Sequence, residues 1–140
     1  MSDFLHRFAR DFTALNADNL ELLSGLYSPD VNFRDPFHEI SGLASLQRYF
    51  SELYANTSDI GFTFYGYDQL REGAGYLRWT LHYRHPRLAD GRPIRVEGCS
   101  YLEWHERVYL HQDYFDAGAL LYEQLPVMGR VIGWLKRRLA

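Results

Sequence analysis

Cysteine is almost absent from this sequence, in which Cys99 is the only one among 140 residues. A single cysteine excludes a disulfide within the chain and leaves no cysteine spacing typical of a metal site. Long apolar runs are also missing, because charged residues interrupt the N-terminal stretch MSDFLHRFARDF throughout. That stretch therefore lacks the apolar core of a signal peptide or a membrane-spanning helix. We expect a soluble protein of the reducing cytoplasm.

An excess of positive charge is missing too. The formal net charge is -3, the isoelectric point is about 6.0, and charges of both signs are scattered along the chain. Binding to nucleic acid depends on a basic face that neutralises phosphates and releases counterions, so we expect no nucleic-acid partner. No group of His, Asp and Glu has a zinc or iron spacing, and we predict neither a metal nor another cofactor.

Apolar and aromatic residues are plentiful, at 46% and 16% of the chain. In a chain of this length such a content is sufficient for one hydrophobic core. We predict a single domain over residues 1–140, in which residues 1–116 form the main body and residues 117–140 a helical extension.

Hydrophobic spacing changes along the chain. Apolar residues three and four apart predict helices over residues 4–15, 20–27 and 43–56. Between the last two, Val31, Phe33 and Asp35 would share one side of a short strand, which points the Asp35 carboxylate toward the core.

From Ile60 the period becomes two, in the runs IGFTFYGYDQL, YLRWTLHYRH, IRVEGCSYLEW and VYLHQDYF. These runs predict four long antiparallel strands, and the last segment returns to helical spacing on either side of Pro126. The order indicates an α+β fold, a cone-shaped curved antiparallel sheet wrapped around the N-terminal helices, with an added C-terminal helix. Its open end would hold a small molecule.

The element order, the stretch LYSPDVNFRDPF followed by SGL, and the ending RVYLHQDYFDA resemble the nuclear transport factor 2-like superfamily. The resemblance is to its SnoaL-like polyketide cyclase and ketosteroid isomerase-like branches. It implies the conical fold over nearly the whole chain. It does not fix the activity, because this fold hosts isomerases, cyclases, hydrolases, dehydratases and proteins without a reaction.

The resemblance places Asp35 where ketosteroid isomerases carry the aspartate that moves a proton beside a carbonyl group. Such chemistry also requires hydrogen-bond donors for the developing oxyanion. Phe12 matches the tyrosine donor of the first helix and cannot donate, whereas Ser100 approximately matches the protonated aspartate and can donate one hydrogen bond. Steroid isomerisation is therefore not expected. An alternative role for Asp35 is to cap the turn into FHEISG.

The last predicted strand places His111, Asp113 and Phe115 on one face, because alternate residues share a side. His111 can act as an acid or a base, and Asp113 can orient it or take the proton itself. The alternative is a structural pair whose polar atoms are satisfied by the backbone or by an arginine. The arginines considered for this role are Arg78, Arg84 and Arg95.

His38 follows Asp35 by three residues, in a loop at the predicted pocket mouth. It can serve as a second acid or base, or it is a solvated loop histidine. An aromatic wall suits an apolar or ring-containing ligand, although ordinary core and dimer packing uses the same residue types. The residues predicted to contact a ligand are Phe12, Tyr54, Trp79, Ser100 and Phe115.

We therefore predict a SnoaL-like protein that binds a small apolar or cyclic molecule, with proton-transfer chemistry of the isomerase, cyclase or dehydratase type. The alternative is a non-catalytic structural or dimerisation module of the same fold. Whether the protein is an enzyme is left open by the sequence.

Aromatic residues in YGY, LHYRH and SYLEW would face outward from the sheet, so we predict a homodimer that buries them. The C-terminal helix combines an apolar face with basic residues and Trp134, as helices at membrane surfaces do. The helix is short and the chain is acidic, so we expect its apolar face to cover the sheet or a partner subunit rather than a membrane.

Overall fold

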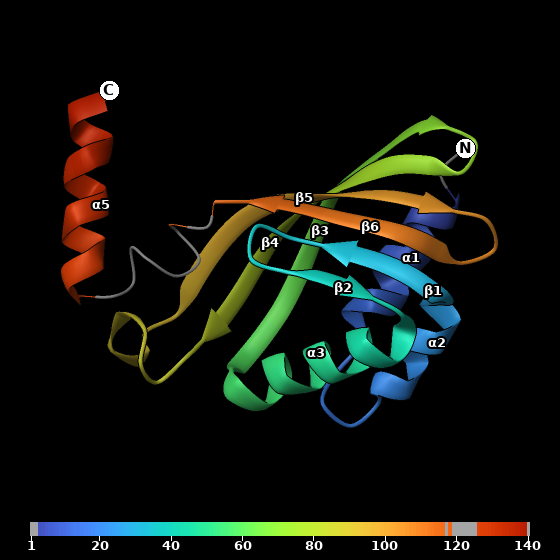
Figure 1. The fold of residues 1–140 in the computed structure, drawn as a ribbon, viewed down its shortest axis with the longest axis horizontal. Helices are drawn as coiled ribbons and strands as arrows, with labels where there is room; N and C mark the ends of the chain where they lie inside the picture. Colours follow the sequence, from blue (N-terminus) through green and yellow to red (C-terminus); the bar gives the residue numbers. More distant parts are fainter. Residues whose placement is uncertain (1–2, 117, 119–125, 140) are drawn as a thin grey trace.

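Six strands form one curved sheet in the order β2-β1-β6-β5-β4-β3, and the N-terminal helices lie against its concave side (Figure 1). The computed structural model describes residues 3–116, 118 and 126–139. Its helices are α1 (Asp3–Thr13), α2 (Leu23–Leu26), α3 (Leu43–Asn56) and α5 (Pro126–Leu139), with 3-10 turns at Leu20–Leu22 and Ala89–Gly91. Its strands are β1 (Tyr27–Arg34), β2 (Glu39–Ser41), β3 (Ser58–Arg71), β4 (Ala74–Arg84), β5 (Ile94–Trp104) and β6 (Val108–Phe115).

The predicted α+β class is confirmed, and so are the third helix and the four long strands. One pairing differs from the prediction of an antiparallel sheet. β1 runs parallel to β6, with Phe33 opposite His111, whereas the other neighbouring strands are antiparallel. The sheet is mixed because the chain leaves β1, passes through α3 and three long strands, and returns to β1 in the same direction.

Two boundaries near β1 also differ from the sequence prediction. Tyr27 begins β1 instead of ending a helix, and residues 39–41 form the short edge strand β2 where a loop was expected. Tyr27 is fully buried, and its hydroxyl group lies 2.8 Å from Nδ1 of His111. That contact spans most of the chain, so local spacing gave no sign of it.

α1 is held on the sheet by one apolar face. Leu5, Phe8, Ala9 and Phe12 are buried at spacings of three, one and three residues, the pattern of an amphipathic helix. Burying an apolar side chain of the size of leucine or phenylalanine contributes roughly 1.5–3 kcal/mol to folding. The phenylalanines of this face also form one wall of the cavity described below.

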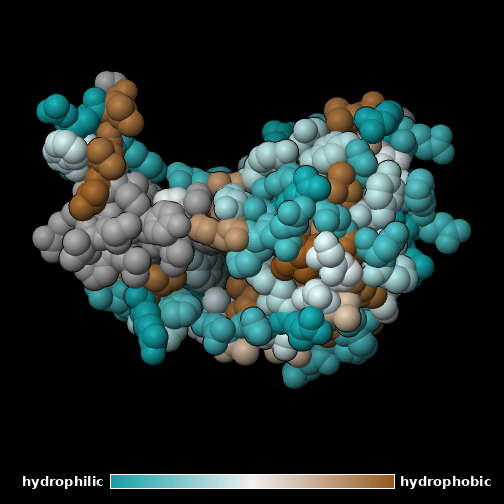
Figure 2. Space-filling model, viewed as in Figure 1, coloured by the Kyte–Doolittle hydropathy of each residue, from teal (hydrophilic) through white to brown (hydrophobic). Residues whose placement is uncertain are grey.

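α5 stands apart from the sheet in this structure (Figure 1). Figure 2 shows hydrophobic residues gathered along one side of it, and Trp134 and Leu135 are 52% and 46% exposed. The apolar face of α5 therefore does not cover the sheet of the same chain, and the alternative, that it covers a partner subunit, stays a prediction. Within the described ranges, every helix is too short or too polar to span a membrane.

Candidate functional site

A cavity of about 530 Å³ opens between the concave side of the sheet and helices α1 and α3. Most of its wall is apolar. The aromatic and aliphatic residues that line it include Phe8, Phe12, Phe33, Phe50, Phe62, Phe64, Trp79, Leu81 and Phe115. Two carboxylates, Asp35 and Asp113, and two imidazoles, His38 and His111, line the same space. A cavity of this size suits a small organic molecule, and its few polar groups would orient that molecule.

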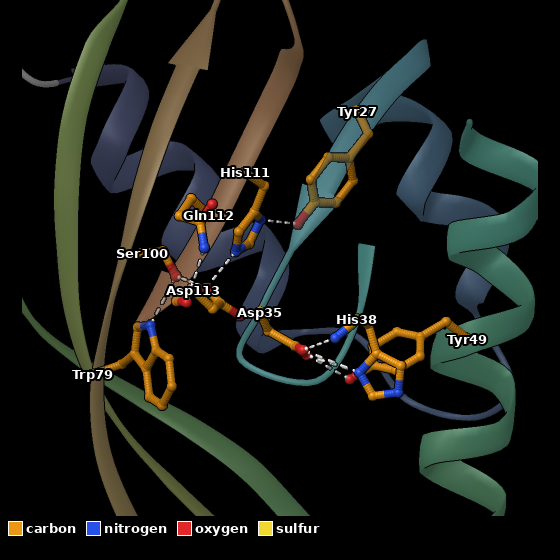
Figure 3. Close-up of polar contacts among 9 residues, drawn as sticks. All are labelled: Tyr27, Asp35, His38, Tyr49, Trp79, Ser100, His111, Gln112 and Asp113. Carbon is orange, nitrogen blue, oxygen red and sulfur yellow. Dashed lines mark hydrogen bonds and ion pairs between the residues drawn. The ribbon is translucent and has the colours of Figure 1, made fainter. Parts of the chain in front are cut away.

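A chain of buried hydrogen bonds converges on one oxygen of Asp113 (Figure 3). His111 Nε2 lies 2.6 Å from Asp113 Oδ1, and the Ser100 hydroxyl donates to the same oxygen across 2.5 Å. Trp79 Nε1 donates in turn to Ser100 Oγ at 2.8 Å. The Asp113 side chain is 13% exposed, and among the described residues no hydrogen bond reaches its Oδ2. One carboxylate oxygen is therefore fixed and the other is available to a ligand.

The sequence dictates this convergence through strand alternation. His111 and Asp113 share the inner face of β6, and the sheet register sets Ser100 of β5 opposite Asp113. Leu77 of β4 lies opposite Ser100, and Trp79 follows on the same face of β4. Each of these four hydrogen-bonded residues therefore lies on a strand of the sheet, whose backbone is rigid.

Tyr27 is the last member of this series of hydrogen bonds, on the side of His111 away from Asp113. Its hydroxyl group lies 2.8 Å from His111 Nδ1, and burial, followed by the nearby Asp113 carboxylate, raises the pKa of Tyr27 well above 10.0. A phenol that keeps its proton donates to Nδ1, which leaves the imidazole proton on Nε2, where it is donated to Asp113. Tyr27 therefore sets the tautomer of His111.

Asp35 is bound at both of its oxygens. Oδ1 accepts the backbone N–H groups of Phe37 and His38 at 2.8 and 2.7 Å, and Nδ1 of the His38 ring at 3.0 Å. Oδ2 accepts the Tyr49 hydroxyl at 3.1 Å. The Asp35 side chain is only 3% exposed. Asp35 therefore caps the turn after β1, as the alternative reading proposed, and lines the cavity as well.

Tyr49 remains a neutral donor in this arrangement. Burial is the largest of the effects that raise the pKa of Tyr49 above 10.0. The negative charge of Asp35 and the hydrogen bond from the Tyr49 hydroxyl to that carboxylate raise this pKa further. At the outer part of the cavity, burial raises the pKa of Tyr83 to about 12. These phenols are donors, not bases, at neutral pH.

No arginine lines the cavity in the part of the chain that the structure describes. The arginines considered as partners of the His111–Asp113 pair lie on the outer face of the sheet and bind other carboxylates. Their partners are Asp68 for Arg78, Asp59 for Arg84 and Glu97 for Arg95. The pair is instead satisfied by Ser100 and Tyr27, and its charge is not neutralised by a fixed cation.

All but one of the predicted site residues line the cavity. Asp35, His38, His111 and Asp113 are there, and so are the predicted ligand contacts Phe12, Trp79, Ser100 and Phe115. Tyr54 is not among the lining residues. It is partly buried and packs against the main core, with its ring centroid 6.3 Å from that of Phe50.

Several polar residues of the site were not predicted. Tyr27 and Tyr49 fall within the helices expected over residues 20–27 and 43–56, and His85 ends the run YLRWTLHYRH. Glu52, Asn56 and Thr57 line the cavity as Tyr49 and His85 do. The sequence carried one signal, since a tyrosine on an apolar helix face brings a hydroxyl group that requires a partner. Across residues 3–116, 118 and 126–139, no three side chains of His, Cys, Asp or Glu gather as a metal site would require.

The chain belongs to the SnoaL-like family, because the model of the SnoaL-like domain matches residues 7–107. No curated protein matches the sequence. The similar solved structures described below are only 16–17% identical to it. Their likeness therefore shows the fold, while the chemistry has to be argued from the site.

Three similar structures show how varied the proteins with this fold are. A protein with a ketosteroid isomerase-like fold from Catenulispora acidiphila DSM 44928, in complex with trimethylamine, is 16% identical with a TM-score of 0.73, over 89% of this chain and 94% of that one. TsrD from Streptomyces laurentii is also 16% identical with a TM-score of 0.73, over 86% and 93%. An LEH-like epoxide hydrolase from M. tuberculosis is 17% identical with a TM-score of 0.64, over 79% and 80%.

Proposed function

We propose that this protein binds a small, largely apolar, ring-containing carbonyl compound in the cavity and moves a proton to and from the carbon beside the carbonyl group. The observation that carries the proposal is the contrast between the two carboxylates. Asp35 has both oxygens bound by donors, whereas Asp113 is held at Oδ1 and keeps Oδ2 available. Asp113 is therefore the base, and its hydrogen-bonded neighbours fix it in position.

The proton transfer balances as follows. Asp113 Oδ2 takes a proton from the carbon beside the carbonyl group, and the electrons of that C–H bond form the enolate. The charge develops on the carbonyl oxygen and requires a donor. His38, when protonated at both nitrogens, donates Nδ1–H to Asp35 and Nε2–H to this oxygen. If the proton on Asp113 is first replaced by one from solvent, its return to the same carbon gives hydrogen exchange, and its return to another carbon gives isomerisation.

Asp35 acts through His38 in this scheme. Its carboxylate fixes the ring through Nδ1 at 3.0 Å, which leaves Nε2 for the ligand. Asp35 is thus a positioning residue. The single free thiol, Cys99, fits a reducing compartment, and the proposal retains the cytoplasm as its place of action.

The test uses small cyclic ketones in D₂O. Proton NMR spectroscopy would follow the loss of the signal from hydrogens beside the carbonyl group, with and without the protein. We expect the protein to accelerate exchange of a ketone that it binds, Asp113→Asn to abolish the acceleration, and His38→Gln to reduce it by roughly 10²-fold or more. Equal exchange with Asp113→Asn and with the unmodified protein would refute the proposal.

Binding without turnover is the second candidate function. A shortage of hydrogen-bond donors for a developing oxyanion favours this alternative. Phe12 has no polar group, the N–H of Trp79 donates to Ser100, and the hydroxyl of Ser100 donates to Asp113. A ketone that binds tightly by calorimetry but exchanges no faster than in buffer would establish this alternative.

A further inference from the structure

An outer recess of about 620 Å³ adjoins the main cavity at the C-terminal end of α3, lined by residues 55–58 and 85–87. Asn56, Thr57 and His85 line both spaces, so the two lie side by side. In Figure 1 the end of α3 and the connection that follows β4 lie at the same end of the molecule. A ligand in the main cavity can therefore extend into the outer recess.

Among the described residues that line the outer recess there is one arginine and no carboxylate. Arg87 lines it, and within the described ranges its guanidinium group makes no ion pair, whereas Arg78 and Arg84 each bind a carboxylate elsewhere. An unpaired guanidinium group beside a cavity is a binding group for carboxylates, because its N–H donors match their two oxygens.

His85 adds a neutral donor to the outer recess. Its Nδ1 accepts the backbone N–H of Arg87 at 3.1 Å. A neutral imidazole that accepts at Nδ1 carries its proton on Nε2, so the second ring nitrogen is a donor. The Asn56 amide, which lines both spaces, supplies further N–H groups. The polar groups of this end therefore suit an acceptor with negative charge.

The opposite end of the main cavity is acidic. Asp35 and Asp113 line the main cavity, and neither lines the outer recess. Leu77 lies opposite Ser100, and β4 runs from there to Tyr83, which over six residues spans roughly 20 Å. An anionic group is repelled from the acidic end and attracted to Arg87, which orients an elongated ligand.

We infer that the ligand is an elongated ring compound with a carboxylate at the end opposite the reacting carbon. The apolar rings lie in the main cavity against Trp79 and Phe115, and the carboxylate lies in the outer recess beside Arg87 and His85. The inference deepens the proposed function by naming the substrate class, and it rests on that function only for the direction in which the rings enter.

The probes are pyrenebutyric acid and its methyl ester, which share the ring system and differ in the charge of the tail. Isothermal titration calorimetry with the full chain would give both dissociation constants. We expect the acid to bind about fivefold more tightly than the ester, an effect of the size that partly exposed ion pairs give. Raising the salt concentration should reduce this preference and leave ester binding in place.

Arg87→Ala should remove most of the preference for the acid and leave the affinity for the ester unchanged. Arg48→Ala is the matched control, because Arg48 is an exposed arginine of α3 that binds Ser45 and lines neither space. It should leave both affinities unchanged. Equal affinities of acid and ester, or an equal loss of both in Arg87→Ala, would overturn the inference.

The failure of the proposed chemistry would look different. Asp113→Asn should lose the exchange of ketone protons but retain the preference for the acid. If the unmodified protein exchanges no protons and still prefers the acid in an Arg87-dependent manner, the proposed catalysis fails and the carboxylate site stands.

Discussion

His111 donates from Nε2 to Oδ1 of Asp113 across 2.6 Å, although the two residues lie only two positions apart on β6. Residues at this spacing stand side by side on one face of a strand, and their side chains meet only if both rotamers are fixed. The Tyr27 hydroxyl fixes the imidazole by its hydrogen bond to Nδ1, and the Ser100 hydroxyl fixes the carboxylate by its hydrogen bond to Oδ1. The contact between His111 and Asp113 therefore depends on packing between strands. Each residue that supports it can be tested by a separate substitution.

Tyr27→Phe should destabilise the protein and release the tautomer of His111. The substitution leaves the buried Nδ1 without its donor, which costs about 1–3 kcal/mol in the free energy of unfolding. Urea unfolding would measure the loss, and ¹⁵N NMR spectroscopy of the ring would show Nδ1–H signal that the unmodified protein lacks. Tyr65→Phe is the control, since Tyr65 is 53% exposed and its loss should change stability by less than about 0.5 kcal/mol. A ring spectrum unchanged in Tyr27→Phe would contradict the role assigned to this phenol.

Trp79→Phe should weaken ligand binding and loosen Asp113. Trp79 is 2% exposed, and its N–H is the donor to Ser100. The phenylalanine leaves a small cavity and an unsatisfied hydroxyl acceptor, with a cost of about 1–3 kcal/mol in unfolding free energy. Fluorescence quenching by an apolar ring compound should also fall, because Trp79 lines the cavity while Trp134 lies outside it. Quenching that stays unchanged would place the ligand elsewhere.

Asp35→Asn should affect the turn after β1 more than the chemistry of Asp113. The asparagine can accept at one oxygen only, so the turn loses part of its support from the N–H groups of Phe37 and His38. We expect a loss of about 1–2 kcal/mol in unfolding free energy, in the range found for capping residues. Ketone exchange should fall less than in Asp113→Asn. If Asp35→Asn abolishes exchange and Asp113→Asn does not, the roles of the two carboxylates are reversed.

Alkaline pH should unfold the protein through its buried phenols. Burial raises the pKa of Tyr54 and of Tyr83 to about 12, from 10.0. Because the unfolded chain loses these protons at lower pH than the folded one, their contribution to stability is complete below pH 10 and is lost as the pH rises to about 12. Circular dichroism and the ultraviolet absorbance of tyrosinate should therefore change together. Ionisation of all tyrosines near pH 10 with the fold intact would contradict this burial.

We expect a homodimer formed through the outer face of the sheet. Tyr65 and Tyr114 are 53% and 52% exposed there, and the ring of Tyr76 packs at a tilt against that of Tyr101, with ring centroids 5.1 Å apart. Such an aromatic surface is stabilised when a second copy covers it. Light scattering should give the mass of a dimer at micromolar concentration, and Tyr114→Arg should shift it toward the monomer. A monomeric unmodified protein would contradict the prediction.

Local pattern was enough to predict most of the elements and the polar face of the last strand. A period of 3.6 residues specified α1 and α3, and a period of two specified the long strands and placed His111, Asp113 and Phe115 on one side. These features depend on neighbours within a few residues, so they can be read before any tertiary contact is known.

Tertiary structure decided the rest, because the deciding contacts join distant parts of the chain. The parallel pairing of β1 with β6 brings Tyr27 to His111 across 84 positions, and helix α3 brings Tyr49 to Asp35. No local period encodes which buried hydroxyl group meets which acceptor, since that depends on register and on the docking of whole elements. For the same reason the sequence could not show which carboxylate has both oxygens bound by donors. Only the fold distinguished Asp35, whose two oxygens are bound, from Asp113, whose Oδ2 receives no hydrogen bond from the described residues.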